Sequence, residues 1–174
     1  INSFNNLIFR RAIRKEPIAY LLNNKEFWSI RFKIDKNVLI PRPETEILVE
    51  RVVRYYKNKK PFVLDVGTGS GCIIVSLLKE LKKSKGIAID VSNKALKTAV
   101  KNSLINNTFK RIKFINTSIT QLSYFKFDLV VSNPPYIARH QLKNLDEDVK
   151  NFEPKIALDG GNDGLDVIRK VIYK

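Results

Sequence analysis

Hydrophobic and polar residues along the chain follow two different patterns. Short, mostly apolar runs occupy residues 62–66, 86–90, 112–115 and 127–131, and stretches with helical periodicity follow them. After the first run, apolar residues recur at the i, i+3, i+4 and i+7 spacing of one helix face, at Ile74, Leu77, Leu78 and Leu81. Short apolar strands that alternate with helices are typical of a parallel sheet with helices on both faces, so we predict an α/β fold.

Two further helices and a hairpin are expected around this sheet. One helix is predicted to begin after Ser92, which suits a cap, and to end near residues 106–107, with inward side chains Leu96, Val100 and Leu104. Another is predicted over residues 43–57, with inward side chains Leu48, Val52 and Tyr55. Looser alternation over residues 27–39 is consistent with a hairpin, and residues 1–20 look like the end of a helix.

Composition narrows the class of protein. The 174 residues are 44% hydrophobic, which is enough for the core of one domain, and no run reaches the roughly 18 apolar residues of a membrane span. A single cysteine, Cys72, excludes an internal disulfide framework and fits a reducing compartment, so we expect a cytoplasmic protein. Because the sequence contains no methionine, we expect it to be a fragment or a processed piece.

The chain is strongly basic. Lys and Arg number 32 against 17 Asp and Glu, a formal net charge of +15, which favours anionic partners such as nucleic acid. These lysines are spread along the sequence without a dense basic run, so the favoured interpretation is diffuse solvated charge. A dedicated nucleic-acid surface is the alternative.

A glycine-rich loop follows the first strand, at residues 65–71 (DVGTGSG). Glycines at alternate positions let the backbone approach a ligand closely, and the start of the following helix favours an anionic group. Asp90 ends the next predicted strand, where its carboxylate suits ribose hydroxyls. The loop has neither the G-x-G-x-x-G spacing of dinucleotide enzymes nor the Lys of a phosphate-binding P-loop. A tight strand-to-helix turn without a ligand is the alternative.

This loop resembles motif I of the class I methyltransferases, which bind S-adenosylmethionine. The resemblance implies a Rossmann-like parallel sheet with that cofactor at the carboxyl ends of its strands. The residues expected to bind the cofactor are Asp65, Gly67, Thr68, Gly69, Ser70, Gly71, Asp90, Ser118 and Asn133.

The fourth apolar run ends in Asn133-Pro134-Pro135-Tyr136, where the two prolines must terminate the strand. In the methyltransferases that this chain resembles, such a tetrapeptide handles a planar amino group. The Asn133 side-chain oxygen and the Pro134 carbonyl would accept its N–H bonds, and Tyr136 would stack on the flat substrate. We therefore expect Asn133, Pro134 and Tyr136 to be catalytic, and Pro135 to join them in substrate binding. An ordinary strand-ending turn is the alternative.

Five further blocks are similar to the protein-glutamine N5 methyltransferases of peptide chain release factors, the HemK/PrmC family. They are residues 16–20 (EPIAY), 26–29 (EFWS), 39–46 (LIPRPETE), 152–154 (FEP) and 157–166 (ALDGGNDGLD). The resemblance implies the remnant of an N-terminal helical domain over 1–24, a β-hairpin over 25–42 and a methyltransferase domain over 43–174 that lacks its C-terminal strands. It implies S-adenosylmethionine as cofactor and the glutamine of a release factor's Gly-Gly-Gln loop as substrate. The fourth strand would then be an open sheet edge.

The chain departs from this family in two places. Asn23 replaces the usual glycine, and asparagine tolerates the left-handed conformation expected there. Thr117-Ser118 replaces an acidic residue and an aromatic one, which should weaken the contact with adenine. Two other hypotheses stay open, namely an N6-adenine methyltransferase acting on nucleic acid and a truncated, non-catalytic chain that binds cofactor or a partner.

Several other residues are of types that can carry chemistry. His140 is more typical of a solvent-facing loop than of a general base, and Cys72 of packing than of a reactive thiolate. Asp146, Glu147 and Asp148 lack a nearby His or Cys, so no metal site is expected. Arg42, Glu44 and Glu46 suit either the mouth of a substrate pocket or ion pairs at a helix start, with no preference between the two.

Overall fold

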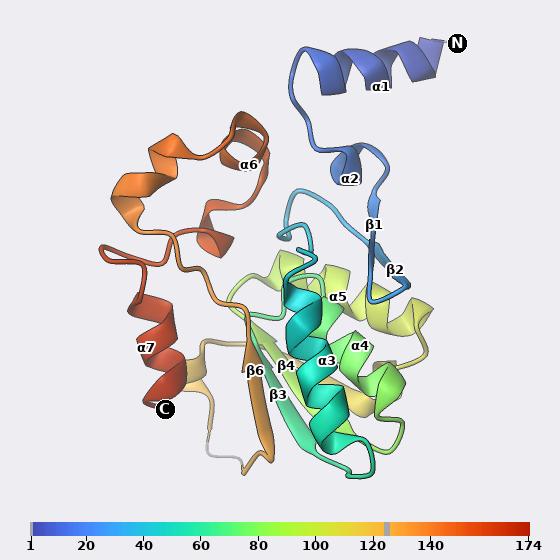
Figure 1. Cartoon of the computed structure of the whole chain (residues 1–174), viewed down its shortest axis with the longest axis vertical. Coiled ribbons are helices and arrows are strands. Elements are labelled where there is room, and N and C mark those ends of the chain that lie inside the picture. Colours follow the sequence, from blue (N-terminus) through green and yellow to red (C-terminus); the bar gives the residue numbers. More distant parts are fainter. Residues whose placement is uncertain (1, 124–125) are drawn as a thin grey trace.

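A four-stranded parallel sheet forms the centre of the computed structural model, which describes residues 2–123 and 126–174 (Figure 1). Its strands are β3 (Phe62–Val66), β4 (Lys85–Asp90), β5 (Ile112–Asn116) and β6 (Leu129–Ser132), in the order β5-β4-β3-β6. The parallel sheet predicted from the apolar runs is confirmed, and β6 lies at an edge of the described sheet as expected. β6 begins two residues later than predicted because Asp128 caps the neighbouring strand, where its carboxylate accepts the Phe62 N–H at 2.7 Å.

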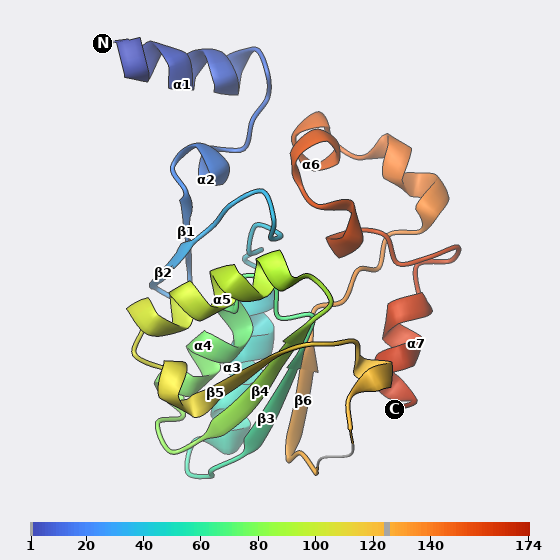
Figure 2. The same ribbon diagram turned by 180° about the vertical axis from the view of Figure 1, so that it is seen from behind.

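Helices cover both faces of the sheet (Figures 1 and 2). On one face lie α3 (Thr45–Tyr56), α4 (Cys72–Glu80) and α5 (Asn93–Ile105), and on the other lie η2 (Ile119–Gln121) and α7 (Asp166–Ile172). Alternate strand residues point to opposite faces. Val63 therefore belongs to the hydrophobic cluster under the first group of helices, whereas Leu64 belongs to the cluster that Val171 of α7 contacts.

The helix positions are predicted well, but two inward side chains are wrong. Ser92 caps α5 as expected, since its hydroxyl accepts the Ala95 N–H at 3.2 Å. Leu104 is exposed, because Asn102 on the buried side of α5 turns inward to bond the backbone of neighbouring elements. Tyr55 of α3 is also exposed, and Val49 occupies the buried position instead.

The N-terminal part contains α1 (Asn2–Ala12), α2 (Ile18–Leu21) and an antiparallel hairpin of β1 (Asn24–Phe27) and β2 (Ile30–Lys33). The hairpin lies earlier in the chain than predicted. Its two-residue turn is Trp28-Ser29, both left-handed with φ of 53° and 52°, and neither is one of the Asn, Asp or Gly residues usual in such a turn. Contacts with helices stabilise this turn, because the Trp28 N–H donates to Glu46 and its indole N–H donates to Glu80. Asn23 is left-handed, as expected.

The remaining short helices are η1 (Phe109–Arg111), η3 (Arg139–Asn144), α6 (Glu147–Phe152) and η4 (Lys155–Ala157). The last three lie in the segment between β6 and α7, above the carboxyl ends of the strands in Figure 1. Among the described residues, every helix is too short or too polar for a bilayer crossing.

Candidate functional site

The glycine loop joins β3 to α4 in a conformation that requires glycine. Gly67, Gly69 and Gly71 all have positive φ, at 70°, 56° and 80°. A side chain at Gly71 would also come within 3.1 Å of the Ala99 Cβ, so this glycine lets α4 and α5 approach each other. The Gly67 and Thr68 N–H groups donate to the Ile89 carbonyl at 2.9 and 3.0 Å, which ties the loop to the end of β4.

Asp90 stands at the carboxyl end of β4 and faces the loop. Its carboxylate accepts the Gly69 N–H at 2.9 Å and the Ser92 N–H at 2.8 Å. Burial raises the pKa of Asp90, and the two backbone N–H bonds oppose that change. Because each carboxylate oxygen has two lone pairs, both oxygens keep the capacity to accept a bond from a ligand hydroxyl.

Asp65 is fully buried beneath the loop. The Thr68 hydroxyl donates to its Oδ2 at 2.7 Å, while its Oδ1 has no hydrogen-bond partner among the described residues. Burial raises the pKa of Asp65 to about 7, although the Thr68 bond and the nearby Ile74 backbone N–H act in the opposite direction. Asp65 therefore holds the loop from below.

A cavity of about 240 Å³ opens above the carboxyl ends of β3, β4 and β5. Seven of the nine residues expected to bind the cofactor line it, while Asp65 and Gly71 do not. Those seven are Gly67, Thr68, Gly69, Ser70, Asp90, Ser118 and Asn133. The opposite wall comes from residues that the sequence did not indicate, among them Val38, Ile156 and, on α7, Val167 and Lys170.

A second cavity of about 180 Å³ adjoins the first and contains Pro134 and Tyr136. Four residues border both cavities, namely Leu39, Arg42, Asn133 and Ala157. The Asn133 side chain donates from Nδ2 to the Thr45 hydroxyl at 3.4 Å, an arrangement that leaves Oδ1 as its acceptor. Pro135 lines the first cavity rather than the second.

The backbone after the two prolines is held by a loop of residues 157–166, which we call the glycine clasp. The Ile137 N–H donates to the Leu158 carbonyl at 3.1 Å, and the Gly160 N–H donates to the Ile137 carbonyl at 2.9 Å. Gly164 has a φ of 84°, and a Cβ there would lie only 2.4 Å from the Tyr136 carbonyl oxygen. The clasp therefore fixes the backbone of Tyr136, whose side chain is largely exposed.

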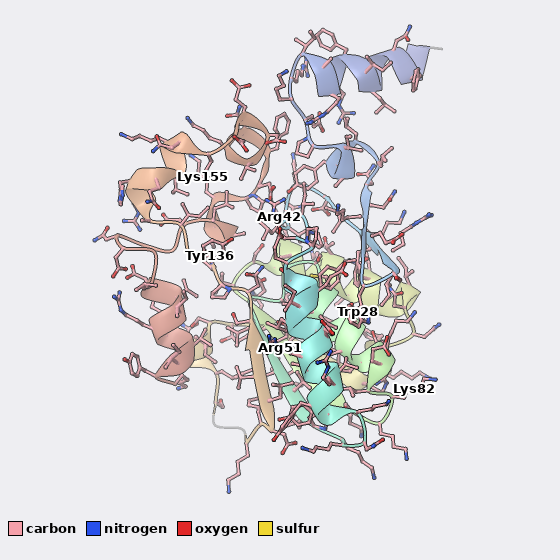
Figure 3. All side chains as sticks on the ribbon, viewed as in Figure 1. Trp28, Arg42, Arg51, Lys82, Tyr136 and Lys155 are labelled. Carbon is pink, nitrogen blue, oxygen red and sulfur yellow. The ribbon has the colours of Figure 1, made fainter. Side chains whose placement is uncertain are left out.

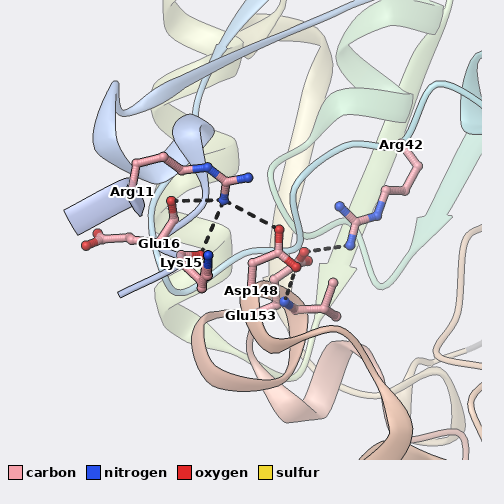
Figure 4. Close-up of polar contacts among 7 residues, drawn as sticks. Arg11, Lys15, Glu16, Arg42, Asp148 and Glu153 are labelled. Carbon is pink, nitrogen blue, oxygen red and sulfur yellow. Dashed lines mark hydrogen bonds and ion pairs between the residues drawn. The ribbon is translucent and has the colours of Figure 1, made fainter. Parts of the chain in front are cut away.

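Arg42 is held at the junction of the cavities by a partner that the sequence did not reveal. Its guanidinium donates to Glu153 at 2.6 Å, and the Glu153 side chain is 1% exposed (Figure 4). The other oxygen of Glu153 accepts the Ile40 N–H at 3.3 Å. Burial raises the pKa of Glu153, whereas Arg42 lowers it. Arg42 thus borders both cavities and pairs with Glu153, while Glu46 bonds the hairpin turn, and a role of this segment at the mouth of a substrate pocket stays a prediction.

Asn102 also links the loop to distant parts of the chain. Its Nδ2 donates to the carbonyls of Ser70 and Lys33, and its Oδ1 accepts the Lys33 N–H. A polar residue within a helix gives no sequence signal for such a role.

The other candidate residues contribute less to the site. Cys72 lines the first cavity, but burial raises the pKa of its thiol to about 12, so the thiol is neutral at physiological pH. His140 is exposed in η3 and lines neither cavity. Asp148 lies 3.7 Å from Arg11, where it connects α6 to α1 (Figure 4).

A glycine loop after β3, a carboxylate at the end of β4 and an Asn-Pro-Pro-Tyr segment after β6 are together typical of a class I methyltransferase. The sequence model of the family described as "Methyltransferase small domain" matches residues 43–151. The chain therefore belongs to the methyltransferase small domain family.

Two curated relatives show which methyltransferases the chain is similar to in sequence. A release factor glutamine methyltransferase of Fusobacterium nucleatum is 38% identical over 173 residues, which cover 98% of this chain and 49% of that protein. A release factor glutamine methyltransferase of Caulobacter vibrioides is 40% identical over 173 residues, which cover 98% of this chain and 60% of that protein. The chain thus spans about half the length of these relatives. Among solved structures, the hMettl16 catalytic domain in complex with an RNA hairpin shares the fold, with a TM-score of 0.69, 20% identity, and coverage of 90% of this chain and 59% of that one.

Proposed function

We propose that this chain transfers a methyl group from S-adenosylmethionine to the side-chain amide nitrogen of the glutamine in the Gly-Gly-Gln loop of a peptide chain release factor. The observation that carries the proposal is the meeting of two cavities at Asn133. The names of the relatives support the substrate. A release-factor substrate assigns the enzyme to the cytoplasm and to translation termination.

The first cavity suits S-adenosylmethionine, which when bound supplies an electrophilic methyl group. The backbone of the loop from Gly67 to Ser70 would hold the amino-acid part of the cofactor, because no side chains intervene at the glycines. Asp90 accepts from the ribose hydroxyls. Ser118 and the apolar side chain of Ile119, which both line the first cavity, would contact the adenine base.

The residues at the junction act on the amide nitrogen. An amide nitrogen is a weak nucleophile because its lone pair is delocalised into the carbonyl group. The Asn133 Oδ1 and the Pro134 carbonyl would accept its two N–H bonds, which favours a tetrahedral nitrogen with its lone pair directed at the methyl group. After the transfer the nitrogen loses one of its two protons to water. Because the Asn133 amide is turned by Thr45 and the Pro134 backbone is rigid, both acceptors are oriented in advance and cost no reorganisation.

The second cavity positions the glutamine. The Tyr136 ring stacks on the planar amide, and the glycine clasp holds the Tyr136 backbone in place. The cavity is small, and the glycines beside the substrate glutamine let its loop enter without side-chain clashes. Arg42 and Tyr136 both lie near the upper end of the sheet in Figure 3, on the side where the strands end.

The test is to incubate the chain with S-adenosylmethionine and a purified release factor, and to locate the added methyl group by mass spectrometry of the Gly-Gly-Gln peptide. Asn133→Ala should lower the rate by about 10²–10³-fold, the effect of removing one oriented hydrogen-bonding group, with a much smaller change in cofactor affinity. Full activity of Asn133→Ala would contradict the mechanism. Methylation of adenine in an RNA oligonucleotide, with none on the peptide, would favour the adenine hypothesis instead.

A further inference from the structure

Lysines that are scattered in the sequence come together at one edge of the sheet. Parallel pairing aligns the beginnings of the strands, since Phe62 pairs with Lys85, Gly86 with Ile112 and Val63 with Leu129. The connections that enter β3, β4, β5 and β6 therefore meet at the amino edge of the sheet, which is the lower end in Figures 1 and 2. The two cavities lie at the opposite, carboxyl edge.

This amino edge holds most of the chain's excess charge. Residues 57–62, 79–85, 109–113 and 126–128 contain eleven of the 32 Lys and Arg but only two of the 17 Asp and Glu, a net +9 of the total +15. Both carboxylates are already engaged, because Asp128 accepts the Phe62 N–H and Glu80 accepts the Trp28 indole N–H. The positive charge is therefore concentrated at the amino edge of the folded chain. The prediction of diffuse solvated charge does not describe these residues.

Ten of these cations are exposed lysines, and none of them forms an ion pair with a carboxylate of the described residues. They are Lys57, Lys59, Lys60, Lys79, Lys82, Lys83, Lys85, Lys110, Lys113 and Lys126. The eleventh cation, Arg111, has a structural role, since its guanidinium donates to carbonyls at the end of α4. Lys82 lies near the lower end of the molecule in Figure 3, far from Arg42 and Tyr136.

We propose that this amino edge binds the phosphate backbone of RNA. Neighbouring strands lie about 4.8 Å apart, so the four strand beginnings span about 15 Å, a length along which several phosphates of one nucleic-acid strand fit. Two exposed aromatic rings stand among the lysines. Tyr55 lies 3.9 Å from the Lys59 ammonium, and Phe109 precedes Lys110. Lysines that follow a backbone, together with exposed rings on which bases stack, are typical of sequence-independent binding to single strands.

The position of this surface separates RNA binding from methyl transfer. RNA at the amino edge lies across the sheet from Asn133, so the surface serves to hold the enzyme on an RNA-rich partner and does not present a base for methylation. The proposal goes beyond the methyltransferase function and does not depend on it.

The test is fluorescence anisotropy with a labelled 20-nucleotide RNA of mixed sequence, over a series of salt concentrations. The edge variant carries Lys59→Glu, Lys60→Glu, Lys82→Glu and Lys83→Glu. The matched control carries Lys36→Glu, Lys94→Glu, Lys97→Glu and Lys101→Glu, four exposed lysines elsewhere, and changes the net charge equally. Thermal melts and S-adenosylmethionine titrations establish that both variants are folded.

We expect the edge variant to lose more than about tenfold in RNA affinity and the magnitude of its salt slope to fall by about 3, the value for four lost phosphate contacts. The control should stay within about threefold of the parent chain, because phosphate contacts are made at the amino edge. Equal losses in both variants would show that only net charge matters. That outcome would overturn the proposal. So would the absence of RNA binding by the parent chain, or stronger binding to phosphatidylserine vesicles than to RNA.

Discussion

Replacing Asp65 by Asn tests how much the ionised carboxylate buried beneath the glycine loop lowers the free energy of unfolding. The two side chains have nearly the same shape, and the Thr68 hydroxyl still finds an acceptor in the Asn oxygen. The substitution therefore removes the charge while it keeps the packing. It adds an N–H₂ group at the position of Oδ1, which has no described partner, and this costs about 1–3 kcal/mol at every pH.

The size of the pH-dependent change in stability follows from the pKa of Asp65. Burial raises the pKa of Asp65 from 3.8 to about 7. The folded chain thus binds one more proton than the unfolded chain between these values, so the free energy of unfolding falls as pH rises through that window. At about 1.36 kcal/mol per pKa unit, the whole change is about 4 kcal/mol. The Asn variant lacks this loss, so its stability relative to the parent should rise by about 4 kcal/mol between pH 4 and pH 8.

Urea denaturation of both chains at pH 4, 5, 6, 7 and 8 measures this difference. Because every other titrating group is shared, its effect cancels when the two free energies of unfolding are subtracted at each pH. The constant cost of the added N–H₂ group also cancels when the differences at two pH values are compared. A difference that stays the same from pH 4 to pH 8 would refute the account of Asp65 as a group whose ionisation opposes folding.

Two further changes test the supports of the junction. Gly164→Ala forces a side chain onto a left-handed residue beside the Tyr136 carbonyl, so methyl transfer should fall by at least tenfold while S-adenosylmethionine affinity, measured by calorimetry, stays unchanged. Loss of cofactor affinity by the same factor would contradict this role. Arg42→Ala leaves the Glu153 carboxylate buried without its partner and should cost about 2 kcal/mol in urea denaturation. Adding Glu153→Gln should restore part of that stability, and a further loss would exclude the pairing.

Much of the sheet and its cofactor side follows from local sequence. β3 has the predicted bounds, because an apolar run buried on both faces carries its own signal, and Ser92 begins α5 because capping is a local interaction. The glycine loop and Asp90 come together because parallel strands end at one edge.

The sequence did not predict features that depend on distant contacts. The hairpin turn at Trp28 is stabilised by Glu46 and Glu80, which no local turn rule contains. Arg42 and Glu153 are 111 residues apart and meet only in the folded chain. The gathering of lysines at the amino edge likewise results from strand pairing, since no single segment of the sequence is densely basic.

A calorimetric titration of this chain with S-adenosylmethionine tests whether the first cavity is the cofactor site, with Asp90→Asn as the variant and the exposed Asp146→Asn as its matched control. We expect saturable binding with one site per chain, an affinity at least about tenfold lower in Asp90→Asn because a charged acceptor is lost, and an unchanged affinity in Asp146→Asn. If the folded chain shows no saturable binding, or binds equally well after Asp90→Asn, the first cavity is not the cofactor site proposed here.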